Sequence, residues 1–239
     1  MSTRKIKQQV LDVLDQENLA QIQRDLSVLD AKELINALIA AICRSEERLR
    51  WHAVTAMGWT VARLADEEME EARIIMRRLL WSLNEESGGI GWGAPEAMAE
   101  IFCRHDGLAE EYVHMLLSYM RPDGDLPHQD GNFLEHETLQ RGLLWAAGRL
   151  AQCRRSLALS KGMADDLPQY LASPDAAVRG LAARATGLLG CCADLARLRD
   201  LTTDNATLRL YEDGQLSTAT VAELAAQAVE RLDASRAGR

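Results

Sequence analysis

Apolar residues recur along the chain with helical spacing, in a ten-residue segment that appears four times. Positions 1, 5, 8 and 9 of this segment are apolar, apart from Thr186, and such a stripe is typical of a helix with one buried face. The segments start 41, 49 and 39 residues apart. This spacing predicts helix pairs that bury their apolar faces against one another. The aligned segments are LRWHAVTAMG at 49–58, IGWGAPEAMA at 90–99, LQRGLLWAAG at 139–148 and VRGLAARATG at 178–187.

A second helix is predicted after each segment, and three more helices are predicted before the first one. In the 66–83 stretch, acidic residues come first and arginines follow, an order that suits the helix dipole. Asp30 has the side chain of an N-cap, and Glu33 completes a pattern resembling a capping box. The expected helices are 5–14, 17–29, 31–44, 66–83, 108–120, 163–171 and 194–201.

The C-terminal stretch has a different pattern. Residues 207–216 alternate apolar and polar side chains around Asp213–Gly214, which predicts a β-hairpin. Ser217 is the expected N-cap of a final helix over 218–232. We expect the hairpin and this helix to cap the array, because terminal repeats need a polar outer face.

Composition supports a single all-α domain. Hydrophobic residues make up 47% of the 239 residues and aromatic residues only 5%. Runs of β-branched and aromatic residues, which would indicate strands, are almost absent. We expect one domain, 1–239, with N-terminal helices in 1–44, helix-pair repeats in 45–205, and the hairpin with its capping helix in 206–239.

Two kinds of segment resemble known repeat proteins. VRGLAARATGLLG and LRWHAVTAMGWTVARLA resemble HEAT-like repeats, including those called phycobilisome-lyase-type. WSLNEESGGIGWGAPEAMAEI and TLRLYEDGQLSTATVAELA together resemble a small bacterial HEAT-like family without an assigned activity. The resemblance covers roughly residues 30–233. It implies an α-α superhelix, a HEAT-like solenoid, that serves as a binding scaffold, and it implies no particular chemistry.

The charge of the chain narrows the range of partners. A net charge of −9 repels phosphate backbones and anionic lipid, so neither nucleic acid nor a membrane is expected as a partner. The N-terminal MSTRKIKQQVLDVLDQ lacks the apolar core of a signal peptide, and no later run reaches membrane-spanning length. These features predict a cytoplasmic protein.

The most unusual stretch is the glycine-rich connection within 81–98. Its glycines leave backbone N–H groups unshielded ahead of a helix N-terminus, a combination that favours anions. Asn84, Glu85 and Glu86 place polar side chains beside them. The stretch is either a binding loop for a peptide or small ligand, or a tight connection whose glycines permit close packing.

Tryptophans occupy equivalent positions in two of the repeats. Trp51 and Trp92 each stand third in their segments, where two aromatic rings either anchor a partner or cover the core between repeats. Trp59, Trp81 and Trp145 lie on apolar stripes and are expected in the core.

The polar connection 121–137 contains acids and histidines that in principle suit a metal ion. No spacing within it fixes two ligands on one helix face, so a solvated loop is the favoured interpretation. Its acidic and histidine residues are Asp123, Asp125, His128, Asp130, Glu135, His136 and Glu137.

Two enzymatic classes of HEAT-like protein are disfavoured. Di-iron deoxyhypusine hydroxylases carry His-Glu pairs at the starts of repeat helices, whereas the matching positions here are Trp51-His52, Trp92-Gly93, Arg141-Gly142 and Gly180-Leu181. HEAT-like alkylpurine DNA glycosylases use a basic face, which the net negative charge does not favour. The sequence therefore predicts no catalytic residue, metal or cofactor.

Two hypotheses remain. The first is a non-enzymatic adaptor that binds a protein or peptide through Trp51, Asn84, Glu85, Glu86, Trp92 and Glu96, the acids selecting a basic feature of the partner. The alternative is a small-ligand-binding protein or enzyme with a site in the groove near 84–96. An adaptor should show a broad groove, and an enzyme a deep pocket with converging polar groups. The oligomeric state is left open.

Overall fold

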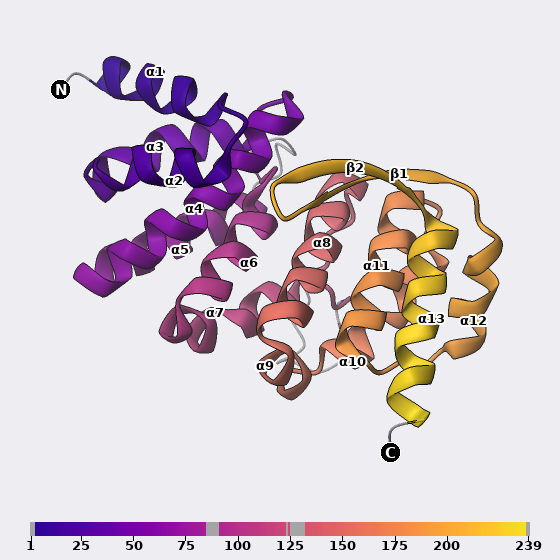
Figure 1. The fold of residues 1–239 in the computed structure, drawn as a ribbon. Coiled ribbons are helices and arrows are strands. Elements are labelled where there is room, and N and C mark those ends of the chain that lie inside the picture. Colours follow the sequence, from indigo (N-terminus) through magenta and orange to yellow (C-terminus); the bar gives the residue numbers. More distant parts are fainter. Residues whose placement is uncertain (1–2, 85–90, 123, 125–131, 238–239) are drawn as a thin grey trace. The chain divides into compact units, whose positions relative to one another are not determined.

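A computed structural model describes residues 3–84, 91–122, 124 and 132–237. These described residues form helices and one two-stranded sheet (Figure 1). Contacts group it into two compact units, Met1–Tyr112 with Tyr211–Gln215, and Val113–Leu210 with Leu216–Arg239. The predicted fold class is confirmed: an all-α HEAT-like α-α superhelix with a small C-terminal hairpin and helix. The division into one domain with three parts stays a prediction.

The first unit contains helices α1 to α6 and the beginning of α7. Helix α4 lies at its centre and packs against both α3 and α6. A Cβ atom at Gly58 of α4 would lie 2.9 Å from the backbone oxygen of Glu100 in α6, so this glycine permits the close approach. The bounds are α1 Thr3–Leu14, α2 Leu19–Ser27, α3 Ala31–Ile42, α4 Glu47–Glu67, α5 Met69–Leu83, α6 Ala94–Arg104 and α7 Asp106–Ser118.

The second unit holds the later repeats. Helix α11 packs between α8 and α13 (Figure 1). A Cβ atom at Gly187 of α11 would meet the Cα of Ala228 in α13 at 2.5 Å, so only glycine fits there. The bounds are α8 Glu137–Cys153, α9 Arg155–Ser160, α10 Met163–Asp166, η1 Pro168–Ala172, α11 Ala176–Leu189, α12 Leu195–Asp200, η2 Leu201–Thr203, β1 Thr207–Glu212, β2 Gln215–Thr220 and α13 Val221–Ala237.

Several predicted elements are confirmed, with bounds shifted by a few residues. The Asp30 side chain accepts hydrogen bonds from the backbone N–H groups of Lys32 and Glu33, as an N-cap does. The hairpin turns at Asp213 and Gly214, both with positive φ, which matches the twist of the two strands. Within the described residues, none of the helices combines the length and apolar character needed to cross a bilayer.

Other boundaries were predicted wrongly. The expected 163–171 helix is divided into α10 and η1, since Pro168 has no backbone N–H to continue the hydrogen-bond ladder. Ser217 lies within β2 and does not cap the last helix. Thr220 caps it instead: its hydroxyl accepts from the Glu223 N–H, and Glu223 accepts from the Thr220 N–H.

The second repeat helix also begins later than the sequence suggested. The aligned segment of this repeat starts at residue 90, whereas α6 begins at Ala94. Gly93 has φ of 79°, a left-handed conformation that ends the preceding turn, and Pro95 occupies the first helical turn. A Cβ atom at Gly93 would lie 2.6 Å from the backbone oxygen of Ile42, so the turn rests directly on the end of α3.

Candidate functional site

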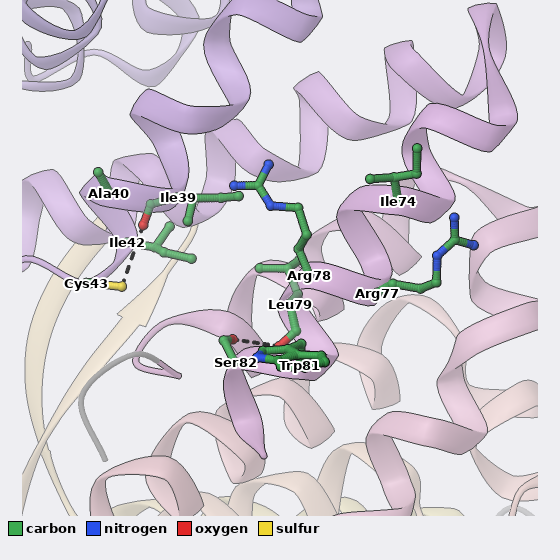
Figure 2. Close-up of a pocket in the computed structure, with 10 residues that line it drawn as sticks. All are labelled: Ile39, Ala40, Ile42, Cys43, Ile74, Arg77, Arg78, Leu79, Trp81 and Ser82. Atoms are coloured by element: carbon green, nitrogen blue, oxygen red, sulfur yellow. Dashed lines mark hydrogen bonds between the residues drawn. The ribbon is translucent and has the colours of Figure 1, made fainter. Parts of the chain in front are cut away.

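Helices α3 and α5 form the walls of an open apolar groove in the first unit (Figure 2). Near the start of α3, Lys32 pairs with Glu68, with 2.8 Å between Nζ and Oε2. Further along, Arg78 Nη2 donates to Asn36 Oδ1 at 3.0 Å. Beyond this contact the groove has a volume of about 650 Å³. Its lining residues are Ile39, Ala40, Ile42, Cys43, Ile74, Arg77, Arg78, Leu79, Trp81 and Ser82.

Trp81 is the most prominent residue of this groove, with 69% of its surface exposed. The expectation that Trp81 belongs to the core is wrong. The buried face of α5 is formed by Ala72, Ile75, Met76, Leu79 and Leu83. Trp81 follows Leu79 by two residues, a rotation of about 200°, so its side chain leaves the opposite side of the helix. Exposed tryptophans beside apolar grooves are typical of interface anchors.

Two arginines supply positive charge at the groove, and they differ in their partners. Arg77 Nη2 lies 2.8 Å from Glu70 Oε1, and this guanidinium lowers the pKa of the Glu70 carboxyl. Arg78 donates to the neutral amide oxygen of Asn36. The groove therefore joins an apolar surface to a cationic group whose described partner carries no charge.

Cys43 places a thiol, a potential nucleophile, in the lining of the groove. Burial, together with the nearby Glu96 carboxylate, raises the pKa of its thiol. Its Sγ donates to the backbone oxygens of Ile39 and Trp92 at 3.5 Å each. A thiol with a raised pKa stays protonated at neutral pH and is a poor nucleophile, so Cys43 serves the groove as an apolar wall.

The residues predicted as a binding surface fall into three environments. Trp92 is 39% exposed, and its backbone oxygen contacts Cys43 in the groove wall. Asn84 is exposed and follows α5, its N–H donating to the Trp81 oxygen at 3.0 Å. Glu85 and Glu86 lie outside the described residues.

Trp51 occupies an interior position of the first unit. It is 6% exposed, and its ring stacks on Tyr211 with centroids 4.7 Å apart and an interplanar angle of 9°. The Arg50 guanidinium lies 4.6 Å from the centroid of the same ring. Trp51 and Trp92 thus share a repeat position but not an environment, because α6 begins only after Trp92 while Trp51 is inside α4.

Glu96 is also interior, in the first turn of α6. It is 4% exposed and its Oε1 accepts from Arg50 Nη1 at 3.2 Å. Its other oxygen, Oε2, is buried without a hydrogen-bond partner in the described part of the chain. Burial raises the pKa of the Glu96 carboxyl, and the opposing attraction of Arg50 does not cancel that effect.

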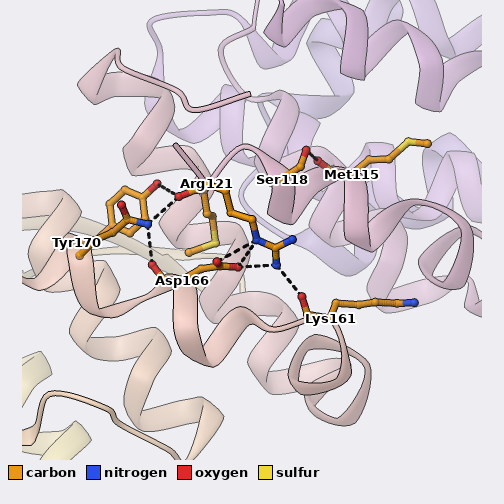
Figure 3. Close-up of polar contacts among 8 residues, drawn as sticks. Met115, Ser118, Arg121, Lys161, Asp166 and Tyr170 are labelled. Atoms are coloured by element: carbon orange, nitrogen blue, oxygen red, sulfur yellow. Dashed lines mark hydrogen bonds and ion pairs between the residues drawn. The ribbon is translucent and has the colours of Figure 1, made fainter. Parts of the chain in front are cut away.

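In the second unit, polar contacts flank the predicted polar connection (Figure 3). Arg121 contacts both carboxylate oxygens of Asp166, the closest approach being 2.8 Å, and donates to the Lys161 oxygen at 2.7 Å. Tyr170 Oη donates to the Met120 oxygen at 3.1 Å. These contacts fasten the end of α7 to α10 and η1, so their role is structural.

The described residues of the connection provide no metal centre. Nowhere in the described part of the chain do three or more His, Cys, Asp or Glu side chains gather as a metal ion requires. His136 caps α8, its Nδ1 accepting from the Thr138 N–H at 3.2 Å. Asp123, Asp125, His128 and Asp130 lie outside the described residues.

No protein-family model and no curated protein matches the chain. Crystal structures of two engineered proteins are similar, each at 14% identity and covering 96% of this chain, with 97% and 98% of their own chains covered and TM-scores of 0.52 and 0.51. The archaeal HEAT-like repeats protein from Thermococcus onnurineus NA1 also aligns, at 14% identity over 97% of this chain and 80% of its own, with a TM-score of 0.38. The likeness to the engineered proteins concerns the fold alone.

Proposed function

We propose that this chain is a non-enzymatic helical-repeat adaptor that binds a protein or peptide in the groove between α3 and α5. The observation that carries the proposal is Trp81, a large aromatic side chain held 69% exposed at the edge of an apolar groove of about 650 Å³. Exposing such a surface to water is unfavourable, and a partner that covers it recovers that free energy.

The proposed surface keeps part of the surface predicted from the sequence. Trp92 and Asn84 are exposed next to groove residues, and Glu85 and Glu86 remain predicted members. Trp51 and Glu96 are buried, so in this proposal they hold α4 and α6 in place and do not touch the partner. Trp81 is added as the central anchor.

The chemistry of the groove supports binding more than catalysis. Its walls are mostly apolar, its thiol is protonated at neutral pH, and the Ser82 hydroxyl donates to the Leu79 oxygen of its own helix at 2.6 Å. Nucleophilic or acid–base catalysis needs a nucleophile beside a base, or an acid beside a base, and the described lining residues include no such pair.

A second candidate is a small-ligand-binding protein, as the sequence also allowed. The groove volume lies within the range of about 300–1,000 Å³ that is usual for small-molecule sites. The openness of the groove to solvent and the exposed ring of Trp81 favour the macromolecular partner, because a small ligand is normally enclosed on most of its surface.

A capture experiment tests the adaptor function. Wild type, Trp81→Ala and Val28→Ala would be immobilised and exposed to lysate of the source cell. Val28 is a matched control, since it is 82% exposed and does not line the groove. We expect wild type and Val28→Ala to retain the same protein and Trp81→Ala to lose it. Equal retention by all three proteins contradicts a role for the groove.

We also propose a cytoplasmic location, and membership of the phycobilisome-lyase-type HEAT-like repeats and of a small bacterial HEAT-like family. The support is the negative charge with a polar N-terminal stretch, and the resemblance of the four segments quoted above.

A further inference from the structure

We infer that the partner segment in the α3–α5 groove is a short amphipathic helix with an acidic edge, and that Arg78 binds its carboxylate. This inference rests on the proposed adaptor function and specifies the chemistry of the partner. It differs from the sequence-based expectation of a basic partner feature, which relied on Glu85, Glu86 and Glu96. Of these, Glu96 is buried in an ion pair with Arg50 and is not available to a partner.

The walls of the groove indicate that the occupant must satisfy its own backbone. The lining consists of helix side chains, mostly Ile, Leu, Ala and Trp, and the backbone N–H groups of the α3 and α5 residues that line it donate within their own helices. An extended peptide would therefore bury C=O groups here without backbone donors, which is costly. A helix pairs its own backbone groups and presents a stripe of apolar side chains, as in other helix-in-groove complexes.

The length of the groove fits about two turns of helix. The α5 residues that line it run from Ile74 to Ser82, and at a rise of 1.5 Å per residue they cover about 12 Å. A partner helix of this length offers apolar residues at positions i, i+3, i+4 and i+7. Trp81 would pack against that stripe at one end.

Charge selects the polar edge of the partner. Arg77 is already neutralised by Glu70, whereas no carboxylate among the described residues is paired with Arg78. The Arg78 guanidinium donates one hydrogen bond to Asn36 and keeps further N–H donors for another acceptor. A guanidinium next to an apolar surface, partly shielded from water by a bound helix, favours a carboxylate over a neutral or basic group.

Synthetic helical peptides provide the test. Three N-acetylated, C-amidated peptides of about 14 residues share Leu at i, i+3, i+4 and i+7 and carry Glu, Gln or Lys at the flanking positions. Their affinities for the full chain would be measured by isothermal titration calorimetry. We expect the Glu peptide to bind wild type about tenfold more tightly than the Gln peptide, with the Lys peptide weakest.

Variants assign the preference to one side chain. Arg78→Gln should remove the advantage of the Glu peptide. Arg77→Gln is the matched control, because Arg77 is already paired with Glu70, and this variant should keep the advantage. Trp81→Ala should weaken all three peptides. Equal affinities of the Glu and Gln peptides for wild type, or an unchanged preference in Arg78→Gln, overturn the inference about charge.

The failure of the inference can be distinguished from the failure of the adaptor function. If no peptide binds but a cellular protein is still captured in a Trp81-dependent manner, the adaptor function stands and the acidic helix is wrong. Two other occupants would also overturn the inference. One is a second copy of the chain, revealed by a wild-type dimer and a Trp81→Ala monomer in sedimentation velocity. The other is an apolar small molecule, revealed if dodecanoate binds wild type and no peptide does.

Discussion

The ring of Tyr211 covers Trp51, with ring centroids 4.7 Å apart and an angle of 9° between the planes. The Tyr211 hydroxyl lies 3.0 Å from Thr55 Oγ1, which in turn donates to the Trp51 backbone oxygen at 3.1 Å. The tip of the C-terminal hairpin therefore completes the core beside α4. Tyr211 shields Trp51 from solvent, although the repeat position of Trp51 had suggested an anchor for a partner.

This stack should make a large contribution to stability. Trp51→Ala should lower the free energy of unfolding by about 3–5 kcal/mol, because it empties a buried aromatic site. Tyr211→Phe keeps the stack and loses the hydroxyl contact with Thr55, so it should cost about 1 kcal/mol. Urea denaturation followed by circular dichroism measures both. A Trp51→Ala protein as stable as Val28→Ala, altered at an exposed residue, would contradict the stack's role.

Trp81 should behave in the opposite way. Since its side chain is 69% exposed, Trp81→Ala should change the free energy of unfolding by no more than about 0.5 kcal/mol. Iodide quenching gives an independent measurement: Trp81→Phe should remove more of the quenchable tryptophan emission than Trp51→Phe does. A strongly destabilised Trp81→Ala protein would mean that this ring supports the fold, and the groove would lose its proposed anchor.

The sequence allowed the fold to be predicted because the evidence for it is local. Helical periodicity, the Asp30 cap and the turn at Asp213–Gly214 act within a few residues, and the structure contains all three. The Ser217 cap was wrong because β-strand and helix-start patterns overlap there, and pairing with β1 extends the strand to Thr220.

The candidate site was predictable only in part, because it depends on contacts between residues far apart in sequence. Trp51 and Trp92 stand at the same repeat position, yet a contact spanning 156 residues, Thr55 with Tyr211, accompanies the burial of the first. The exposure of Trp81 depends on which face of α5 meets its neighbours. Counting from Leu79 could have revealed it, since the two residues lie on opposite sides of the helix.

The revised start of the last helix gives a direct comparison of two hydroxyl side chains. Thr220→Ala removes the N-cap and should lower the free energy of unfolding by about 1 kcal/mol. Ser217→Ala should have a smaller effect, because its Oγ makes only a 3.4 Å contact with the Leu210 oxygen. Thermal or urea denaturation of the two variants side by side measures the difference. A larger loss of stability for Ser217→Ala would support Ser217, the N-cap expected from the sequence, over Thr220.

Gly93 should tolerate no side chain, for reasons of both conformation and space. Gly93→Asn should destabilise the protein by several kcal/mol, since the new Cβ would lie 2.6 Å from the Ile42 backbone oxygen. Gly162 is the matched control: its φ of 85° is similar, but a Cβ there meets only the end of the Arg121 side chain, at 3.3 Å. Asparagine accepts left-handed φ, so Gly162→Asn should be mild. Equal losses of stability in the two variants would show that the left-handed backbone conformation, and not the lack of space, causes the loss at Gly93.

Glu96 should make stability depend on pH. Burial raises the pKa of its carboxyl in the folded state, so the folded protein holds this proton more tightly than the unfolded chain does. The stability that this proton provides is complete below the unfolded-state pKa of about 4.3 and is lost as the pH rises through the raised folded-state pKa. Glu96→Gln removes this titration while keeping a side chain of nearly the same shape.

The measurement is the free energy of unfolding of wild type minus that of Glu96→Gln, determined in urea at several pH values from about 4 to 8. We expect this difference to fall as the pH rises, because Glu96 then loses its proton in the folded protein. The other titrating groups are common to both proteins, so their contributions cancel in the difference. The ion pair with Arg50 limits the fall, since it stabilises the charged form. A difference that rises with pH would mean that the attraction of Arg50 exceeds the cost of burying the carboxylate, and that the pKa of Glu96 is lowered.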